Sequence, residues 1–503
     1  MATRAAPGET RPGAPVPLSA VPPLDDQQRQ AVRALMTMAP VADELGTRFA
    51  AAGFALHLVG GPVRDALLGR AGDDLDFATD ARPEQVLEII DGWAEAVWTM
   101  GITFGTVGLS KDSHRLEVTT YRSESYDASS RKPEVVYGDT LIGDLARRDF
   151  SVNSMALSVP GHEFADPSGG LADLLARRLR TPGRPEDSFG DDPLRMMRLA
   201  RFASQLGFVP DADVVAAATA MSERITIVSA ERVRDELTKL LLAPDPVPGL
   251  ELLVDTGLAT HVLPELPKMR LEIDPVHHHK DVYAHSLAVL QRAIALETDG
   301  PDLTLRMAAL LHDIGKPRTR AFGPAGVSFH HHELVGASMA RTRLRALRYP
   351  KQFIEDVCRL VELHLRFHGY GTGTWNDSAV RRYVRDAGPL LDRLNALVRS
   401  DCTTRNRRKA AALSSAYDEL EHRIAFLAEE EAHAALRPDL DGREIMEILG
   451  VPPGRIIGAA RAFLLELRLE HGPLERAEAV RLLQEWAAAL PEPIAEPSEP
   501  DGT

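Results

Sequence analysis

Cysteine is nearly absent from this sequence, since Cys358 and Cys402 are the two cysteines among 503 residues. Two cysteines cannot supply a disulfide framework or a cysteine-rich zinc site, which fits a reducing compartment, and we expect a cytoplasmic protein. Long apolar runs are also missing: no segment approaches the roughly 20 residues of a membrane span, and the N-terminus lacks a charged start with an apolar signal core. We therefore expect no membrane partner and no export.

Positive charge is in deficit as well, because 58 lysine and arginine residues stand against 73 aspartate and glutamate residues, a net charge of −15. An acidic chain has little general affinity for phosphate backbones, so RNA binding would need local basic patches. Basic residues outnumber acidic ones from Arg381 to Lys409. That stretch is either such a patch or an ordinary solvated helix face.

The stretch from Leu56 to Thr79 organises the rest of the chain. An apolar run from Leu56 to Val59 predicts a buried strand, Gly60-Gly61 a turn that lets the backbone approach a phosphate, and Val63 to Leu68 a helix. Further on, alternation in a strand places Asp74 and Asp76 on one face. A lone Asp-x-Asp more often begins a surface strand, but two carboxylates beside a glycine turn suit magnesium and nucleotidyl transfer.

A third carboxylate is a candidate for the same site. Alternation from Arg115 to Arg122 places Glu117 and Tyr121 on one face of a second predicted strand. Glu117 either approaches the aspartates and helps to deprotonate or position the attacking hydroxyl, or faces solvent. Alternation alone does not decide between the two positions.

These motifs resemble the class II tRNA nucleotidyltransferase and bacterial poly(A) polymerase family, within the polymerase-beta-like superfamily. The run from Val59 to Gly69 followed by Asp74-Leu-Asp76 resembles its first motif, and the run from Leu145 to Met155 its second. The resemblance implies magnesium on the two aspartates, and a flexible loop in the polar, apparently unstructured segment Ser123–Asp139. The nucleotide contacts that it implies are Gly60, Gly61, Arg64, Arg148, Asp149 and Asn153.

A basic helix follows at Asp191–Phe202, in which Asp191 or Asp192 can cap the first turn. Asp192, Arg195, Arg198 and Arg201 are spaced by three and should share one face. An aspartate acceptor beside an arginine donor matches the pairing edges of cytosine and adenine but not those of uracil and guanine. The resemblance implies this role for Asp192 and Arg195, with the other two arginines near the phosphates or in support. The alternative is an amphipathic helix with a solvated basic face.

A second constellation begins at Ala309–Lys316, which resembles the signature of HD-superfamily phosphohydrolases. Imidazole and carboxylate ligands suit a transition metal such as Ni, Mn, Co, Fe or Zn. The resemblance implies that His312 and Asp313 bind it together with His285 and Asp401. Four further histidines are candidates for a second metal: His331, His332, His364 and His368. Such a site can hydrolyse cyclic or terminal phosphates or small nucleotides, or serve structure alone.

The predicted fold class is α+β: a polymerase-beta-like nucleotidyltransferase head with a small mixed sheet, followed by all-α neck, HD and tail domains. The predicted boundaries are a disordered tail at 1–24, the head at 25–160, the nucleotide-selecting neck at 161–267, the HD domain at 268–410, a helical tRNA-binding tail at 411–490 and a disordered end at 491–503.

The predicted function is template-independent, Mg²⁺-dependent addition of CCA to the 3′ end of tRNA from CTP and ATP, with a second, phosphohydrolase activity in the HD domain. DNA is not an expected partner. The alternatives within the enzyme class are a poly(A) polymerase or an enzyme that adds only CC or only A. A different class is an HD phosphohydrolase or RNA-binding regulator with an inactive head, against which the intact carboxylate pair argues.

Overall fold

The computed structural model describes residues 26, 29, 40–70, 72, 74–125, 134–138, 140–271, 281–323, 326–367, 375–402, 407–435, 438–471 and 474–490. Both tails predicted to be disordered, 1–24 and 491–503, lie outside the described residues. The chain divides into two compact units, Met1–Leu365 with Ala396–Thr403, and Arg366–Asn395 with Thr404–Thr503. Each unit is described by itself.

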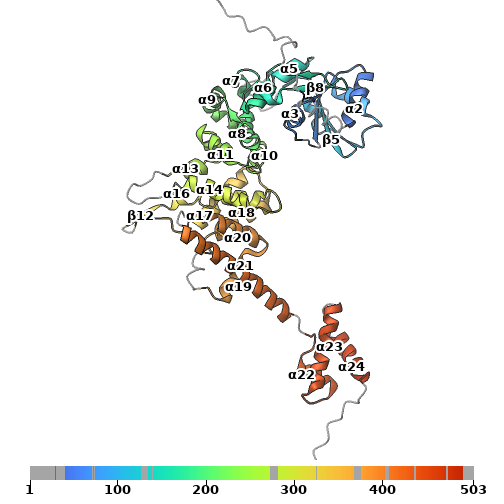
Figure 1. Ribbon diagram of the computed structural model, residues 1–503, viewed down its shortest axis with the longest axis vertical. Helices are drawn as coiled ribbons and strands as arrows, with labels where there is room; N and C mark the ends of the chain where they lie inside the picture. Colours follow the sequence, from blue (N-terminus) through green and yellow to red (C-terminus); the bar gives the residue numbers. More distant parts are fainter. Residues whose placement is uncertain are drawn as a thin grey trace, which may run out of the picture. The chain divides into compact units, whose positions relative to one another are not determined.

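The first unit begins with a seven-stranded mixed sheet in the order β3-β4-β5-β2-β1-β8-β9. Figure 1 shows helices α2 and α3 beside this sheet, of which it labels β5 and β8. Strands β2 and β5 pair in parallel, and the other neighbours are antiparallel. The strands are β1 (Leu56–Val59), β2 (Asp74–Thr79), β3 (Ala96–Trp98), β4 (Thr106–Lys111), β5 (His114–Thr120), β8 (Ala156–Val159) and β9 (Phe164–Ala165).

Helices cover the apolar face of this sheet, where Leu75, Phe77, Leu116 and Val118 are buried. Helix α2 packs on β1 and β8, α4 packs on β4 and β5, and the two helices contact each other. The helices of this region are α2 (Pro40–Ala51), α3 (Gly61–Leu67), α4 (Pro83–Ile90) and α5 (Leu141–Ala146), with 3-10 turns η2 (Ile102–Phe104) and η3 (Ser151–Asn153). The predicted small mixed sheet with helices on one side is therefore confirmed.

The segment Ser123–Asp139, predicted to be unstructured, contains part of an antiparallel pair. Strand β6 (Arg122–Ser125) pairs with β7 (Glu134–Tyr137). Residues 126–133 and 139 lie outside the described residues. The prediction was wrong at both ends of the segment, because strands of four residues, one polar and one with the adjacent apolar pair Val135-Val136, show no apolar alternation by which to recognise them.

The neck is helical, and it adds one short ladder between β10 (Arg178–Leu179) and β11 (Val209–Pro210). Helix α8 packs against α10 and α11, which gives this region its core. The helices are α6 (Gly170–Ala176), α7 (Pro185–Asp191), α8 (Leu194–Leu206), α9 (Ala212–Ala220), α10 (Ala230–Leu241), α11 (Val247–Asp255), α12 (Leu258–Val262) and α13 (Glu265–Lys268), with the 3-10 turn η4 (Ser222–Ile227).

The region that follows holds the histidine cluster on packed helices, with α17 against α18 and α14 and α18 against α15. Its helices are α14 (Val282–Ala295), α15 (Leu303–Leu311), α16 (Lys316–Thr319), α17 (His332–Ala346), α18 (Lys351–Leu363) and α20 (Leu391–Asp401). A hairpin of β12 (Ala321–Gly323) and β13 (Gly326–Ser328) lies between α16 and α17. Strands this short escape detection by periodicity, so the neck and HD regions are not purely helical as predicted.

The second unit is helical, with α19 (Asp377–Ala387), the 3-10 turn η5 (Gly388–Leu390), the start of α20, α21 (Arg407–Ala435), α22 (Gly442–Leu449), α23 (Arg455–His471) and α24 (Arg476–Ala488). The last three helices share a core around Ile445, Leu464 and Leu483. Within the part of the chain that the structure describes, no helix is both long and apolar enough to cross a membrane. Cys358 and Cys402 are free thiols, and burial raises the pKa of Cys358.

Candidate active sites

Three carboxylates meet on the open face of the head sheet. Strand β2 alternates between the exposed Asp74 and Asp76 and the buried Leu75 and Phe77, as predicted. Strand β5 runs parallel to β2 with Glu117 directly beside Asp76. Because residues side by side in a sheet point to the same face, Glu117 joins the aspartates, which decides between its two predicted positions.

The charges of this cluster call for a cation. The pKa of Asp76 is raised, first because surrounding protein displaces water and then because Glu117 and Asp74 are negative. The positive side chains of Arg148 and Arg198 oppose that shift. Hard oxygen donors on one face of a sheet suit a divalent cation such as Mg²⁺, which would offset the repulsion between the carboxylates.

The glycine turn lies next to an arginine from the second predicted motif. Gly60 has a φ of 72°, and a Cβ atom there would lie 2.9 Å from Nη1 of Arg148. Glycine therefore permits both the backbone conformation and the close approach of the guanidinium. Arg148 and Arg147 donate to the buried Asp144, and they lower its pKa although burial raises it. Asp144 was not predicted, and it fixes an arginine that faces the carboxylates.

A chain of hydrogen bonds links the remaining motif residues. Arg64 Nη1 donates to Asn153 Oδ1 over 2.6 Å, Asn153 Nδ2 donates to Asp149 Oδ1 over 3.0 Å, and Arg198 Nε donates to Asp149 Oδ2 over 2.7 Å. Arg64 lies in α3, three residues after Gly61, the first residue of that helix. Burial raises the pKa of Asp149, but Arg198 and Asn153 outweigh it and hold that pKa well below the usual range. The predicted nucleotide contacts from three separate segments thus form one network.

The arginines of α8 are not a solvated basic face. Arg201 is buried and donates to Glu236 Oε2 over 2.6 Å, while Arg198 lies 4.0 Å from the same carboxylate group. The Arg64, Arg198 and Arg201 guanidinium carbons lie 5.3, 5.5 and 4.0 Å from the centre of the Phe202 ring. Arg201 is therefore held within the core by Glu236, and its predicted role near the phosphates or in support of Asp192 and Arg195 stays a prediction.

The two predicted base-reading residues start the same helix. Helix α8 begins at Leu194, with Pro193 at its N-cap position and no side-chain cap, so the predicted cap at Asp191 or Asp192 is wrong: Asp191 ends the preceding helix α7. Asp192 lies between the two helices, and its Oδ1 accepts from the Leu194 N–H over 3.1 Å. Its other oxygen accepts from Arg232 of α10 over 2.6 Å. Arg195 is buried and donates to the Ser188 side chain and to the Arg147 carbonyl. Asp192 retains further lone pairs and Arg195 further N–H groups, so both have capacity for a base edge.

The second constellation assembles around Asp313. On one side, His285 Nε2 and His312 Nε2 lie 3.4 and 3.2 Å from Asp313 Oδ2. Asp401 Oδ1 lies 2.9 Å from His285 Nε2 and 3.7 Å from His312 Nε2. The four residues implied by the resemblance are therefore together, brought in by α14, the end of α15 and α20.

Two more histidines approach the other oxygen of the same carboxylate. His332 Nε2 and His364 Nε2 lie 3.2 and 4.0 Å from Asp313 Oδ1. His285, His312 and Asp401 thus form one potential ligand group and Asp313, His332 and His364 another. His331 is exposed and outside both groups, and His368 lies outside the described residues.

The donor set fits metal ions closely. His312, His332 and His364 each hydrogen-bond a main-chain carbonyl through Nδ1, which fixes the ring and leaves Nε2 as the ligand atom. Those three Nε2 atoms and Asp313 Oδ1 are buried without a hydrogen-bond partner among the described residues. Buried acceptor atoms without a partner are costly unless an ion binds them. The geometry accommodates one ion on each side of the Asp313 carboxylate.

Electrostatics support the same assignment. Burial lowers the pKa of His312, but Asp313 and Asp401 raise it overall to about 10, so the site attracts positive charge. Burial and the nearby His312 lower the pKa of His364 to about 3, which keeps its ring neutral and able to bind metal. Lys316, which sequence reasoning missed, donates to Asp313 Oδ2 over 2.6 Å. Its spacing of three residues from Asp313 was the available signal.

Three protein families match successive parts of the chain. The Poly A polymerase head domain matches residues 56–180, the Probable RNA and SrmB-binding site of polymerase A matches residues 207–269, and the HD domain matches residues 282–405. The range matched by the first family contains the three carboxylates and the glycine turn, and the range matched by the third contains both potential metal-ligand groups.

Similar proteins extend over nearly the whole chain. An A-adding tRNA nucleotidyltransferase of Deinococcus radiodurans is 34% identical over 86% of this chain and 96% of its own. A CC-adding tRNA nucleotidyltransferase of Thermus thermophilus is 33% identical over 85% and 93%, and a CCA-adding enzyme of Enterococcus faecalis is 28% identical over 88% and 94%. The crystal structure of the Bacillus stearothermophilus CCA-adding enzyme with CTP has the same fold, with a TM-score of 0.55 at 24% identity over 92% of this chain and 98% of that one.

Proposed function

We propose that this chain, which belongs to the tRNA nucleotidyltransferase family, adds cytidylate and adenylate to the 3′ end of tRNA from CTP and ATP. The observation that carries the proposal is the group of Asp74, Asp76 and Glu117 on one open sheet face beside the glycine turn. A cytoplasmic location, expected from the scarcity of cysteine, stays a prediction.

The residues of the head would divide the reaction among them. Asp74 and Asp76 would hold Mg²⁺, which when bound neutralises phosphate charge and aligns the attacking and leaving oxygens. Glu117 would orient the 3′-hydroxyl of the tRNA or accept its proton. Arg148, held over Gly60 by Asp144, would bind the triphosphate, and Asp149 would accept from the ribose 2′-hydroxyl.

Base selection would follow from the start of α8. The amino group of cytosine or adenine would donate to Asp192, and Arg195 would donate to the neighbouring ring nitrogen. Uracil and guanine place a carbonyl oxygen against the carboxylate, which is repulsive. The bonds of Arg195 to Ser188 and Arg147 hold the guanidinium in place, so the discrimination needs no nucleic-acid template.

Incubation with tRNA transcripts that end before, within and after CC, followed by sequencing of the products, tests this function. Full CCA on the shortest transcript is the expected result. Asp74→Asn should give no product, and Arg270→Gln, which removes an exposed ion pair with Asp255 far along the chain, serves as the control. A wild-type protein that extends none of the transcripts would contradict the proposal.

A partial activity is the second candidate, because two relatives above 30% identity over most of the chain are named A-adding and CC-adding enzymes. The same transcripts separate the cases. An enzyme that adds only A would extend the transcript that ends in CC and no shorter one, and an enzyme that adds only CC would stop before A. A poly(A) polymerase would instead extend RNAs unrelated to tRNA with many adenylates.

For the HD region we propose metal-dependent phosphohydrolysis. His285, His312, Asp313 and Asp401 would hold a transition metal, which when bound supplies a nucleophilic hydroxide at neutral pH. His332 and His364 would bind a second ion through the other oxygen of Asp313. The test is release of phosphate from RNA ends with cyclic or terminal phosphates, after chelation and reloading with Ni²⁺, Mn²⁺, Co²⁺, Fe²⁺ or Zn²⁺. Metal binding without hydrolysis would make the site structural.

A further inference from the structure

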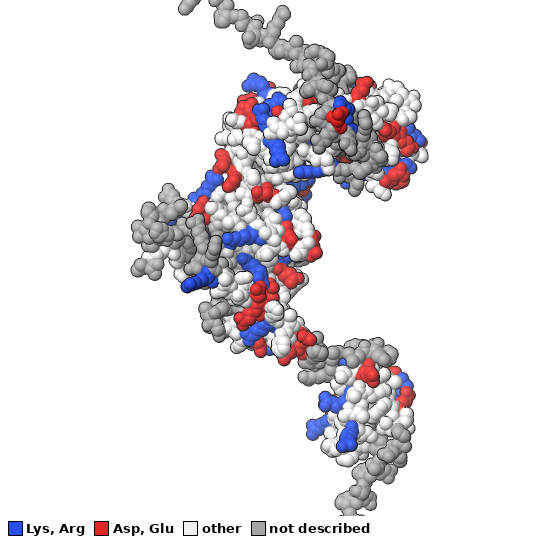
Figure 2. Space-filling view, in the orientation of Figure 1, with Lys and Arg blue, Asp and Glu red and all other residues white. Residues whose placement is uncertain are grey.

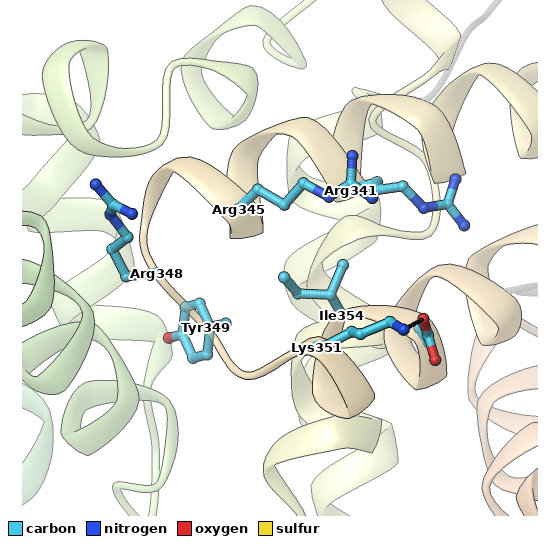
Figure 3. A pocket seen from close by; sticks show the side chains of 7 residues that line it. Arg341, Arg345, Arg348, Tyr349, Lys351 and Ile354 are labelled. Carbon is cyan, nitrogen blue, oxygen red and sulfur yellow. Dashed lines mark ion pairs between the residues drawn. The ribbon is translucent and has the colours of Figure 1, made fainter.

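A basic pocket lies where α17 turns into α18, outside both candidate active sites. It is lined by Arg341, Arg345, Arg348, Tyr349, Lys351, Ile354 and Glu355 and encloses about 490 Å³. Figure 3 shows Arg341 and Arg345 on α17, with Ile354 and Lys351 facing them from α18. Four cations and one carboxylate thus line the pocket, in a chain whose net charge is −15.

The charges of the basic pocket are largely uncompensated. Arg341 and Arg345 form no ion pair within the described residues, although they are one helical turn apart and repel each other. Lys351 lies 3.7 Å from Glu355, and Arg348 lies 4.0 Å from Glu231, with both pairs largely exposed to solvent. On the face drawn in Figure 2, basic and acidic side chains are otherwise interspersed.

The pocket is built on a fixed turn that is tied to the neck. Tyr349 is buried, stacks on Phe353 with ring centres 4.8 Å apart, and shares a hydrogen bond of 2.9 Å with Thr238 of α10. Arg234 of α10 donates to the Arg348 carbonyl over 2.9 Å. Helix α10 belongs to residues 207–269, which match the family described as a probable RNA-binding site.

We propose that the basic pocket binds backbone phosphates of the tRNA substrate. Its free donors are guanidinium and ammonium groups, which recognise phosphate oxygens and carry no base-reading pattern. A volume of several hundred Å³ exceeds one phosphate and suits a short run of backbone. The inference rests on the proposed function for its choice of partner, and it explains how an acidic protein holds RNA.

The test measures tRNA affinity from 50 to 200 mM salt for four proteins. These are the wild type, Arg341→Gln with Arg345→Gln, Arg341→Lys with Arg345→Lys, and a control with the same change in charge, Arg177→Gln with Arg184→Gln, at exposed arginines outside the pocket. Loss of two phosphate contacts should weaken binding about tenfold at low salt and reduce the slope of log affinity against log salt by about 1.4 to 1.8. The lysine pair should retain most of the slope.

Steady-state kinetics distinguish a tRNA contact at the pocket from binding of a free nucleotide there. The KM for tRNA should rise in the glutamine pair while kcat and the KM for ATP stay at wild-type values. A Kd and slope equal to those of the control would overturn the proposal, and so would a raised KM for ATP with unchanged tRNA binding, which would indicate a free nucleotide in the pocket. If the wild-type protein binds tRNA through the pocket but adds no nucleotide to it, the proposed function is wrong and the proposed tRNA contact at the pocket is retained.

Discussion

Replacing Asp192 by alanine tests base selection directly, because the structure separates its structural from its chemical role. One oxygen accepts from the Leu194 N–H at the start of α8, and the other pairs with Arg232. The Asp192 side chain is 18% exposed and the Arg232 side chain 53% exposed. Arg232 therefore has access to water when its partner is removed.

The expected loss of stability is small. The lost hydrogen bond from the Leu194 N–H costs about 1 kcal/mol, and a lost ion pair with a half-exposed arginine costs at most about 1 kcal/mol. A total of about 1 to 2 kcal/mol corresponds to a fall in Tm of several degrees, so Asp192→Ala should be folded under assay conditions.

The expected loss of discrimination is much larger. A hydrogen bond from the base to a charged acceptor contributes about 1.5 to 3 kcal/mol, which is a loss of about 10- to 150-fold in kcat/KM for ATP. GTP and UTP lose a repulsive contact at the same time, so the ratio of ATP to GTP should fall by more than about tenfold. The assay is kcat/KM for each of the four nucleotides on tRNA that lacks its terminal A.

Arg232→Gln is the matched control, since it removes the same ion pair and keeps the Asp192 carboxylate. It should preserve the ratio of ATP to GTP. An unchanged ratio in Asp192→Ala would refute the base-reading role. Equal weakening of all four nucleotides, with strong dependence on salt, would instead identify Asp192 as part of the general electrostatics of phosphate binding.

Three further changes address the other groups. Asp76→Asn should lower the rate of addition by more than about 100-fold with an unchanged circular dichroism spectrum, since it removes several kcal/mol of metal-dependent stabilisation; near wild-type addition at saturating Mg²⁺ would contradict the metal assignment. Asp313→Ala should abolish transition-metal binding measured by mass spectrometry, and His364→Ala should halve the amount of bound metal. A loss of nucleotide addition in either variant would mean that the metal supports tRNA binding. Glu236→Ala should lower the free energy of unfolding by about 3 to 5 kcal/mol in urea, because it leaves the buried Arg201 unpaired, and a change below 1 kcal/mol would argue against that pair.

Local patterns in the sequence determined the parts of both sites that lie within one element. Alternation in a strand was enough to place Asp74 and Asp76 on one face, because side-chain direction has a period of two. The glycine turn and the adjacent His312 and Asp313 could also be recognised from the sequence, since each is a run of neighbouring residues.

The tertiary structure decided which segments meet. The sequence could not tell whether Glu117 joins the aspartates, because periodicity does not specify which strand lies beside another, and the parallel pairing of β2 with β5 settles it. Likewise, helical spacing gave Arg198 and Arg201 a common face but not their partners. Asp149 and Glu236 come from distant segments and pair with these arginines, which argues against the alternative of a solvated basic face, because arginines without partners are too costly to bury.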